Sequence, residues 1–199
     1  DAKTLRRLLS SRSSLIAFKG HSDGVDATLS DRAYLCDIHR LQGDDVALRL
    51  PACVRANHCR RINMPLHKAL RDQRILNVES INARVVVWNT CWGFLPPPHT
   101  GKKFGLGLRI GMSEEVGVAI TTCNGPVLQN ATTGAALIDD LAAGVPAGEA
   151  VYRHNASFTA RQMGHTMIIV GDPRCVATLP SGPQISTVAV PSDLVHRSI

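Results

Sequence analysis

Apolar residues are arranged along the chain in two patterns that predict secondary structure, namely helical spacing and short continuous runs. Residues 4–10 place Leu5, Leu8 and Leu9 at helical spacing, which predicts a short amphipathic helix. Further helices are predicted over residues 64–74, 106–115, 131–143 and 146–154. Short apolar runs predict strands at residues 15–18, 84–88, 116–122 and 167–170. The run RVVVW at residues 84–88 has the β-branched composition of a central strand covered on both faces.

Alternating strands and helices of this kind predict an α/β fold with a mostly parallel central sheet and helices on both faces. A chain of 199 residues suits a single domain. Because the first residue is Asp rather than Met, we expect residues 1–199 to be a fragment of a longer protein. Residues 22–63 are polar, irregular and rich in Cys and His, and we interpret them as an insertion within that domain. The prolines at 96–98 predict a loop, and the polar tail from residue 181 predicts an edge or extended segment.

Composition narrows the classes of function. An apolar fraction of 44% excludes an intrinsically disordered chain. The sequence has neither an apolar run of membrane-spanning length nor a signal peptide, so we expect no membrane partner. A net charge of +6 carried by scattered basic residues, with 4% aromatics, disfavours a nucleic-acid partner. Six cysteines are too few for a disulfide-held scaffold, which favours a reducing, cytoplasmic location.

Residues capable of nucleophilic chemistry follow two of the predicted strands. His21 lies in Lys19-Gly20-His21-Ser22-Asp23-Gly24, and Cys91 lies in Asn89-Thr90-Cys91-Trp92-Gly93. In parallel sheets, reactive groups gather at the carboxyl ends of strands, so His21 and Cys91 would face each other if their strands are neighbours. The imidazole could then accept the thiol proton and later protonate a leaving amine. The alternative is that Cys91 is a small core residue and His21 an ordinary loop residue.

Other residues near these strand ends are candidates for supporting roles. Gly93 would let the chain turn sharply after Cys91, and backbone N–H groups at Ser22 and Cys91 could bind a developing oxyanion. Asp23 and Asp172 could line a pocket for a basic side chain, although capping of the adjacent turns is the alternative we favour. Cys123 follows the strand at 116–122, so its loop is expected to line the substrate groove while the thiol itself packs.

The order of these motifs resembles the caspase-like cysteine peptidase clan, which includes caspases, gingipains, separases and CHAT-domain proteases. Residues 18–24 resemble the clan's apolar strand ending in Gly-His, and residues 89–93 resemble its Cys-x-Gly signature. The Gly-Asp-Pro at 171–173 and Gly-Glu-Ala at 148–150 are similar to steps in gingipain-like and CHAT-like members. The likeness covers residues 14–175 and implies a His21–Cys91 dyad, one dominant residue before the scissile bond, and regulation by other segments or proteins.

The chain departs from that pattern in three places. Ser22 stands where many members have glycine, and His21 and Cys91 are 70 residues apart instead of about 50. Residues 36–59 account for most of the excess, which supports the interpretation of an insertion. The clan also has strands before the histidine strand, which here would lie in a preceding segment or another chain.

Four residues of the segment 22–63 have the chemistry of a zinc site. Cys36-x2-His39 and Cys53-x5-Cys59 supply four ligands of the type that tetrahedral zinc prefers, and His58 could replace Cys59. A structural Zn²⁺ would order a loop with little apolar content. The alternative is that these cysteines are unpaired or form disulfides. No role in the chemistry is expected for this site.

The leading hypothesis is therefore a cysteine endopeptidase, a hydrolase acting on a protein or peptide substrate through His21 and Cys91, with no cofactor for catalysis. The alternative is a non-catalytic caspase-like scaffold with a structural zinc site and protein partners. A zinc-stabilised nucleic-acid module is a third hypothesis, disfavoured by the scattered charge.

Overall fold

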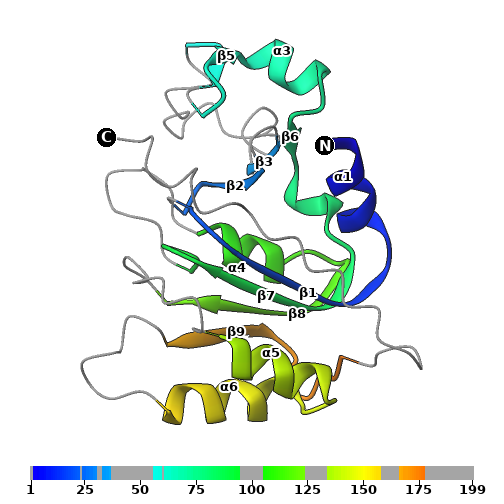
Figure 1. The fold of residues 1–199 in the computed structure, drawn as a ribbon, viewed down its shortest axis with the longest axis vertical. Helices are drawn as coiled ribbons and strands as arrows, with labels where there is room; N and C mark the ends of the chain where they lie inside the picture. Colours follow the sequence, from blue (N-terminus) through cyan, green and yellow to red (C-terminus); the bar gives the residue numbers. More distant parts are fainter. Residues whose placement is uncertain are drawn as a thin grey trace.

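A four-stranded sheet with the order β1-β7-β8-β9 forms the centre of the structure (Figure 1). The computed structural model describes residues 2–22, 24–30, 33–36, 56–59, 61–94, 105–123, 134–157 and 166–177. Strands β1 (Ser13–Gly20), β7 (Ala83–Thr90) and β8 (Val116–Thr122) are parallel, whereas β9 (Met167–Gly171) is antiparallel to β8. The predicted α/β fold with a mostly parallel sheet is thus confirmed. The β-branched strand β7 lies inside the sheet with Arg84 as its single exposed residue.

Helices cover both faces of this sheet, as the strand–helix alternation predicts (Figure 1). On one face, α1 (Ala2–Ser10) and α4 (Leu106–Gly111) pack in a cluster with Val86 and Trp88 of β7. On the other face, α5 (Ala135–Ala142) and α6 (Ala147–Ala156) pack in a second cluster with Val85 and Val87. Side chains alternate between these clusters along β7 because successive residues of a strand point to opposite faces.

Part of the segment 22–63 belongs to the core. Strands β2 (Asp26–Ser30) and β3 (Ala33–Cys36) pair antiparallel, and β6 (Ile75–Leu76) pairs parallel with β3. Ala27, Leu29 and Leu35 are at most 4% exposed and pack in the same cluster as Trp88. The interpretation of this segment as polar and irregular is therefore wrong for β2 and β3, whose small apolar residues alternate with polar ones. Residues 37–55 lie outside the described part of the chain.

The predicted helices are found, with shifted ends. The helix expected over 64–74 is α3 (Leu66–Arg71), because Met64 and Pro65 form β5 (Met64–Pro65), which pairs with β4 (His58–Cys59). The helix expected over 106–115 ends at Gly111, and a short 3-10 helix, η2 (Val78–Ser80), precedes β7. The prolines at 96–98, where a loop is predicted, and the tail from 181 lie outside the described residues. No helix among the described residues combines the length and apolar character needed to cross a membrane.

An aromatic pair joins β1 to β7 beyond their backbone hydrogen bonds. The rings of Phe18 and Trp88 stack with centroids 4.3 Å apart and planes at 21°. Trp88 is 1% exposed, so nearly all of its surface is removed from water. These two residues are also register partners in the parallel ladder. The stack therefore favours one alignment of β1 against β7.

We expect Trp88→Ala to lower the free energy of unfolding by about 3–5 kcal/mol, because it leaves a large cavity and removes the partner of Phe18. Tyr152→Ala is the matched control, since Tyr152 is 71% exposed on α6 and its truncation should change stability by less than about 0.5 kcal/mol. Urea unfolding followed by circular dichroism measures both. Equal losses for the two variants would contradict the assigned core.

Candidate functional site

His21 and Cys91 directly follow the last register pair of two neighbouring parallel strands. The β1–β7 ladder ends with Gly20 opposite Thr90, so the next position on each strand is His21 and Cys91. Neighbouring strands lie about 4.8 Å apart, and both residues therefore lie at the same edge of the sheet. His21 is exposed and Cys91 is half-buried, so solvent reaches both. The two strands are thus neighbours, which is the condition on which the proposed pairing of His21 with Cys91 depends, and the catalytic roles stay a prediction.

The turn that carries Cys91 packs closely against β8 and α4. The Gly93 N–H donates to Thr122 Oγ1 over 3.3 Å, and the Phe94 N–H donates to the Thr122 carbonyl over 3.0 Å. The Gly93 carbonyl accepts from the Gly107 N–H at 2.8 Å, in the first turn of α4. Hydrogen bonds to β8 and to α4 thus fix the path of the chain after Cys91.

Glycine at position 93 is required for packing space. The left-handed backbone conformation in this turn belongs to Trp92, with φ of 55°. A Cβ atom added to Gly93 would lie 2.1 Å from Thr121 Oγ1 and 2.8 Å from Thr122 Oγ1. Gly93 is thus needed, as predicted, but the predicted reason is wrong. The position lacks space for a side chain beside Thr121 and Thr122, whereas the unusual backbone conformation of the turn is at Trp92. A bulky residue in the left-handed region is strained, and such strain persists only where the surroundings impose it.

Threonines at the ends of β7 and β8 are part of this site and were missed by the sequence analysis. The Thr122 hydroxyl donates a hydrogen bond to the Thr90 carbonyl while accepting one from Gly93. Thr90, Thr121 and Thr122 are all 0% exposed. A Thr-Thr step at the end of an apolar strand is ordinary β composition, so no sequence signal distinguished these hydroxyl groups.

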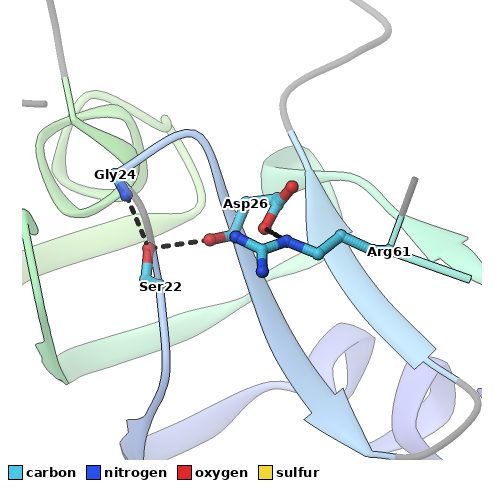
Figure 2. Close-up of polar contacts among 4 residues, drawn as sticks. All are labelled: Ser22, Gly24, Asp26 and Arg61. Carbon is cyan, nitrogen blue, oxygen red and sulfur yellow. Dashed lines mark hydrogen bonds and ion pairs between the residues drawn. The ribbon is translucent and has the colours of Figure 1, made fainter. Parts of the chain in front are cut away.

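The loop after His21 is closed by its own hydrogen bonds. Ser22 Oγ donates to the Asp26 carbonyl at 2.7 Å and accepts from the Gly24 N–H at 2.9 Å (Figure 2). The Thr28 N–H donates to the His21 carbonyl at 3.2 Å. The Gly24 carbonyl in turn accepts from the N–H of Leu106 at 2.9 Å, at the start of α4. The Ser22 hydroxyl thus holds the loop, and an oxyanion role for the Ser22 backbone N–H stays a prediction.

The other residues predicted near this edge have different outcomes. Cys123 follows β8 directly, at the same edge as Cys91, and its N–H donates to the Thr166 carbonyl at 3.3 Å. Asp172 follows β9, which is antiparallel, so it lies at the opposite edge and cannot line a pocket beside Cys91. The predicted turn capping by Asp172 is confirmed, because its carboxylate accepts from the Arg174 N–H at 2.9 Å. Hydrogen bonds from Arg174 lower the pKa of Asp172 below its ordinary value. Asp23 lies outside the described residues.

Two further residues complete the electrostatic description of this part of the molecule. Lys19 is half-buried on β1 two residues before His21, and burial lowers the pKa of its ammonium group. His154 lies in the last turn of α6 and is 7% exposed. A cavity of about 590 Å³ lined by Ser13, Ala83 and Gly117 lies at the amino ends of the parallel strands. That cavity is at the opposite edge from Cys91 and has no part in the candidate site.

Two of the four residues predicted to bind zinc lie in one apolar cluster. Cys59 is 9% exposed beside Leu66 and Ala69, and Cys36 packs against the same cluster. Burial raises the pKa of the nearby Tyr34 hydroxyl, and negative charge on Cys59 acts in the same direction, although Arg74 opposes it. Among the described residues no three His, Cys, Asp or Glu side chains form a metal site. His39 and Cys53 lie outside the described part of the chain, so the zinc site stays a prediction.

Comparison of the chain with protein-family models, with curated proteins and with solved structures gives no match. The geometry of the two strand ends therefore carries the functional argument.

We expect Thr122→Val to lower the free energy of unfolding by about 1–3 kcal/mol, because it leaves the buried Thr90 carbonyl and Gly93 N–H without that partner. Thr90→Val is the matched control: among the described residues Thr90 Oγ1 is buried with no hydrogen-bond partner, so the same change there should be nearly neutral. Thermal unfolding of both variants makes the comparison. A control as unstable as Thr122→Val would contradict this assignment of the hydroxyl groups.

Proposed function

We propose that this protein is a cysteine peptidase that cleaves peptide bonds with His21 as general base and acid and Cys91 as nucleophile. The observation that carries the proposal is the register of β1 against β7, whose last pair is Gly20 opposite Thr90, so that His21 and Cys91 are the next residue on each strand. The exposure of His21 and the partial exposure of Cys91, at the ends of neighbouring strands, support this proposal, because a dyad needs two nearby groups that substrate can reach.

The chemistry of the proposed dyad follows from the properties of the two groups. A free thiol is mostly protonated near neutral pH, and a neighbouring imidazole converts it to a thiolate by accepting the proton. The Cys91 thiolate attacks the scissile carbonyl carbon, and the tetrahedral intermediate expels the amine, which takes the proton from the His21 imidazolium. The resulting thioester is hydrolysed by a water that His21 deprotonates, which breaks the C–S bond and releases the carboxylate product and the thiol.

Stabilisation of the oxyanion is assigned to backbone N–H groups at the edge of the sheet, at Cys91 and Ser22. Preorganised donors act well in such a role because they need no rearrangement during the reaction. The hydrogen bonds that fix Gly93 and Phe94 against Thr122 favour preorganisation of the turn at Cys91. Those that close the loop between Ser22 and Asp26 do the same on the histidine side.

The proposed activity agrees with the caspase-like resemblance of the two motifs. That resemblance implies a protein or peptide substrate and further segments or subunits that regulate activity, and the low cysteine content favours a cytoplasmic location. A scaffold that retains the two residues without catalysis is the competing hypothesis, and the reactivity of the Cys91 thiol separates the two.

We expect an electrophilic thiol probe to label Cys91 at near-neutral pH, and His21→Ala to slow this labelling by about 10²–10⁴-fold, because the loss of a general base removes that much rate. Peptide mass spectrometry after timed labelling identifies the modified cysteine and its rate. Cys91→Ala should abolish the signal at this peptide and any peptide-bond hydrolysis.

Two variants control for nonspecific effects. Cys175→Ala removes a half-buried thiol whose Sγ lies 3.5 Å from the Arg84 carbonyl, at the other end of the sheet, and should leave the Cys91 rate unchanged. His67→Ala removes an exposed imidazole on α3 and should do the same. Labelling of Cys91 that is equally fast in wild type and His21→Ala would exclude the dyad and favour the scaffold.

A further inference from the structure

We infer that Arg61 is a positioning residue for His21, which it holds in place through an ion pair with Asp26. The inference rests on the proposed function and extends it, because it assigns control of the dyad to the small unit formed by β4, β5 and α3. Arg61 lies between β4 and β5 and is 40 residues further along the chain than His21.

The first step is the closure of the loop between His21 and Asp26. The Ser22 hydroxyl bridges the Asp26 carbonyl and the Gly24 N–H, and Ser22 also forms a β-bridge with Ala27. Ser22 is 2% exposed, so these bonds are shielded from water. A displacement of Asp26 is therefore transmitted to Ser22 and its neighbour His21.

The second step is the attachment of Asp26 to the small unit. Arg61 Nε donates to Asp26 Oδ1 at 2.8 Å, and the two side chains are only 26% and 19% exposed (Figure 2). By contrast, Arg71 Nε lies 3.4 Å from Asp72 Oδ1, and these two side chains are 70% and 38% exposed. A shielded, short charge-assisted hydrogen bond is stronger than an exposed one, which water screens.

The third step is the anchoring of Arg61 itself. Arg61 lies two residues after Cys59, and its neighbour Ile62 packs in the cluster of Cys59, Leu66 and Ala69. The titratable and charged groups near the ion pair include Tyr34, Cys59 and Arg74, since Arg74, Cys59, Arg61 and Asp26 all act electrostatically on the Tyr34 hydroxyl. Arg61 is thus fixed by an apolar cluster, and its guanidinium fixes Asp26.

The experiment measures the rate of Cys91 alkylation by iodoacetamide as a function of pH. If the proposed dyad operates, wild-type Cys91 should react at pH about 6, where an ordinary thiol is almost wholly protonated and unreactive. Arg61→Ala should lower the rate there by about 10–100-fold, because a small misplacement of a catalytic group has an effect of that size. At pH about 9.5, where ordinary thiols are ionised, the two proteins should react alike.

Matched variants separate positioning from general destabilisation. Arg71→Ala removes the exposed ion pair on the same unit and should leave the pH profile unchanged. Arg61→Lys should retain part of the wild-type rate, and the charge-reversed double variant Asp26→Arg with Arg61→Asp should restore part of it. If Arg61→Ala gives the wild-type profile, or Arg71→Ala shifts it equally, the inference is overturned.

Failure of the dyad itself is recognised separately. If His21→Ala leaves the wild-type pH profile unchanged, the proposed function fails. The position of His21 is then followed by NMR, from the ring resonances of His21, which are assigned by their loss in His21→Gln. If the His21 resonances shift in Arg61→Ala and do not shift in Arg71→Ala, Arg61 positions His21 even though His21 is not catalytic. Unchanged His21 signals in both variants overturn it.

Discussion

The parallel, in-register pairing of β1 with β7 is the constraint on which the rest of the structure depends. Strand residues alternate between the faces of a sheet, so a slip of one residue would exchange the side chains facing α4 with those facing α5 and α6. Ile16 and Phe18 pack on one cluster and Leu15 on the other, which makes such a slip costly. The position of His21 beside Cys91 is therefore a consequence of core packing. Burial of apolar side chains fixes the register, and the register fixes which two residues leave the sheet together.

Close backbone packing explains the composition of the turn that follows Cys91. Gly93, Gly105 and Gly107 occupy positions where a Cβ atom would lie within 2.1–2.5 Å of another atom. Trp92, directly before Gly93, adopts a left-handed conformation that a bulky side chain avoids. The turn is thus specified by the absence of side chains on one side and by the Thr122 hydroxyl on the other. An arrangement of this kind holds the backbone at one conformation at the expense of local strain, a combination that is common at functional sites.

The sequence was sufficient to predict elements whose own periodicity is strong. The strands at Arg84 and Val116 and the helix at Leu5 were predicted closely, because runs of apolar residues or helical spacing identify them without tertiary information. The sequence alone was insufficient where contacts between residues far apart in the chain decide whether a residue is buried or where it lies. The small residues Ala27 and Ala33 are buried in one cluster with Trp88, which lies more than 50 residues away in sequence, and the antiparallel direction of β9 places Asp172 away from Cys91. Likewise, the ion pair of Asp26 with Arg61 spans 35 residues and leaves no local pattern.

The first turn of α4 connects the two halves of the candidate site. The first N–H groups of a helix have no acceptor within the helix and must find one elsewhere. Here the Leu106 N–H donates to the Gly24 carbonyl in the histidine loop, and the Gly107 N–H donates to the Gly93 carbonyl in the cysteine turn. Both loops are therefore attached to consecutive residues of one helix, which limits how far apart they can move. Because that attachment uses backbone groups alone, it is compatible with many side chains at the site. The side chains of Asp26 and Arg61 remain as the element that adjusts His21 within this limit.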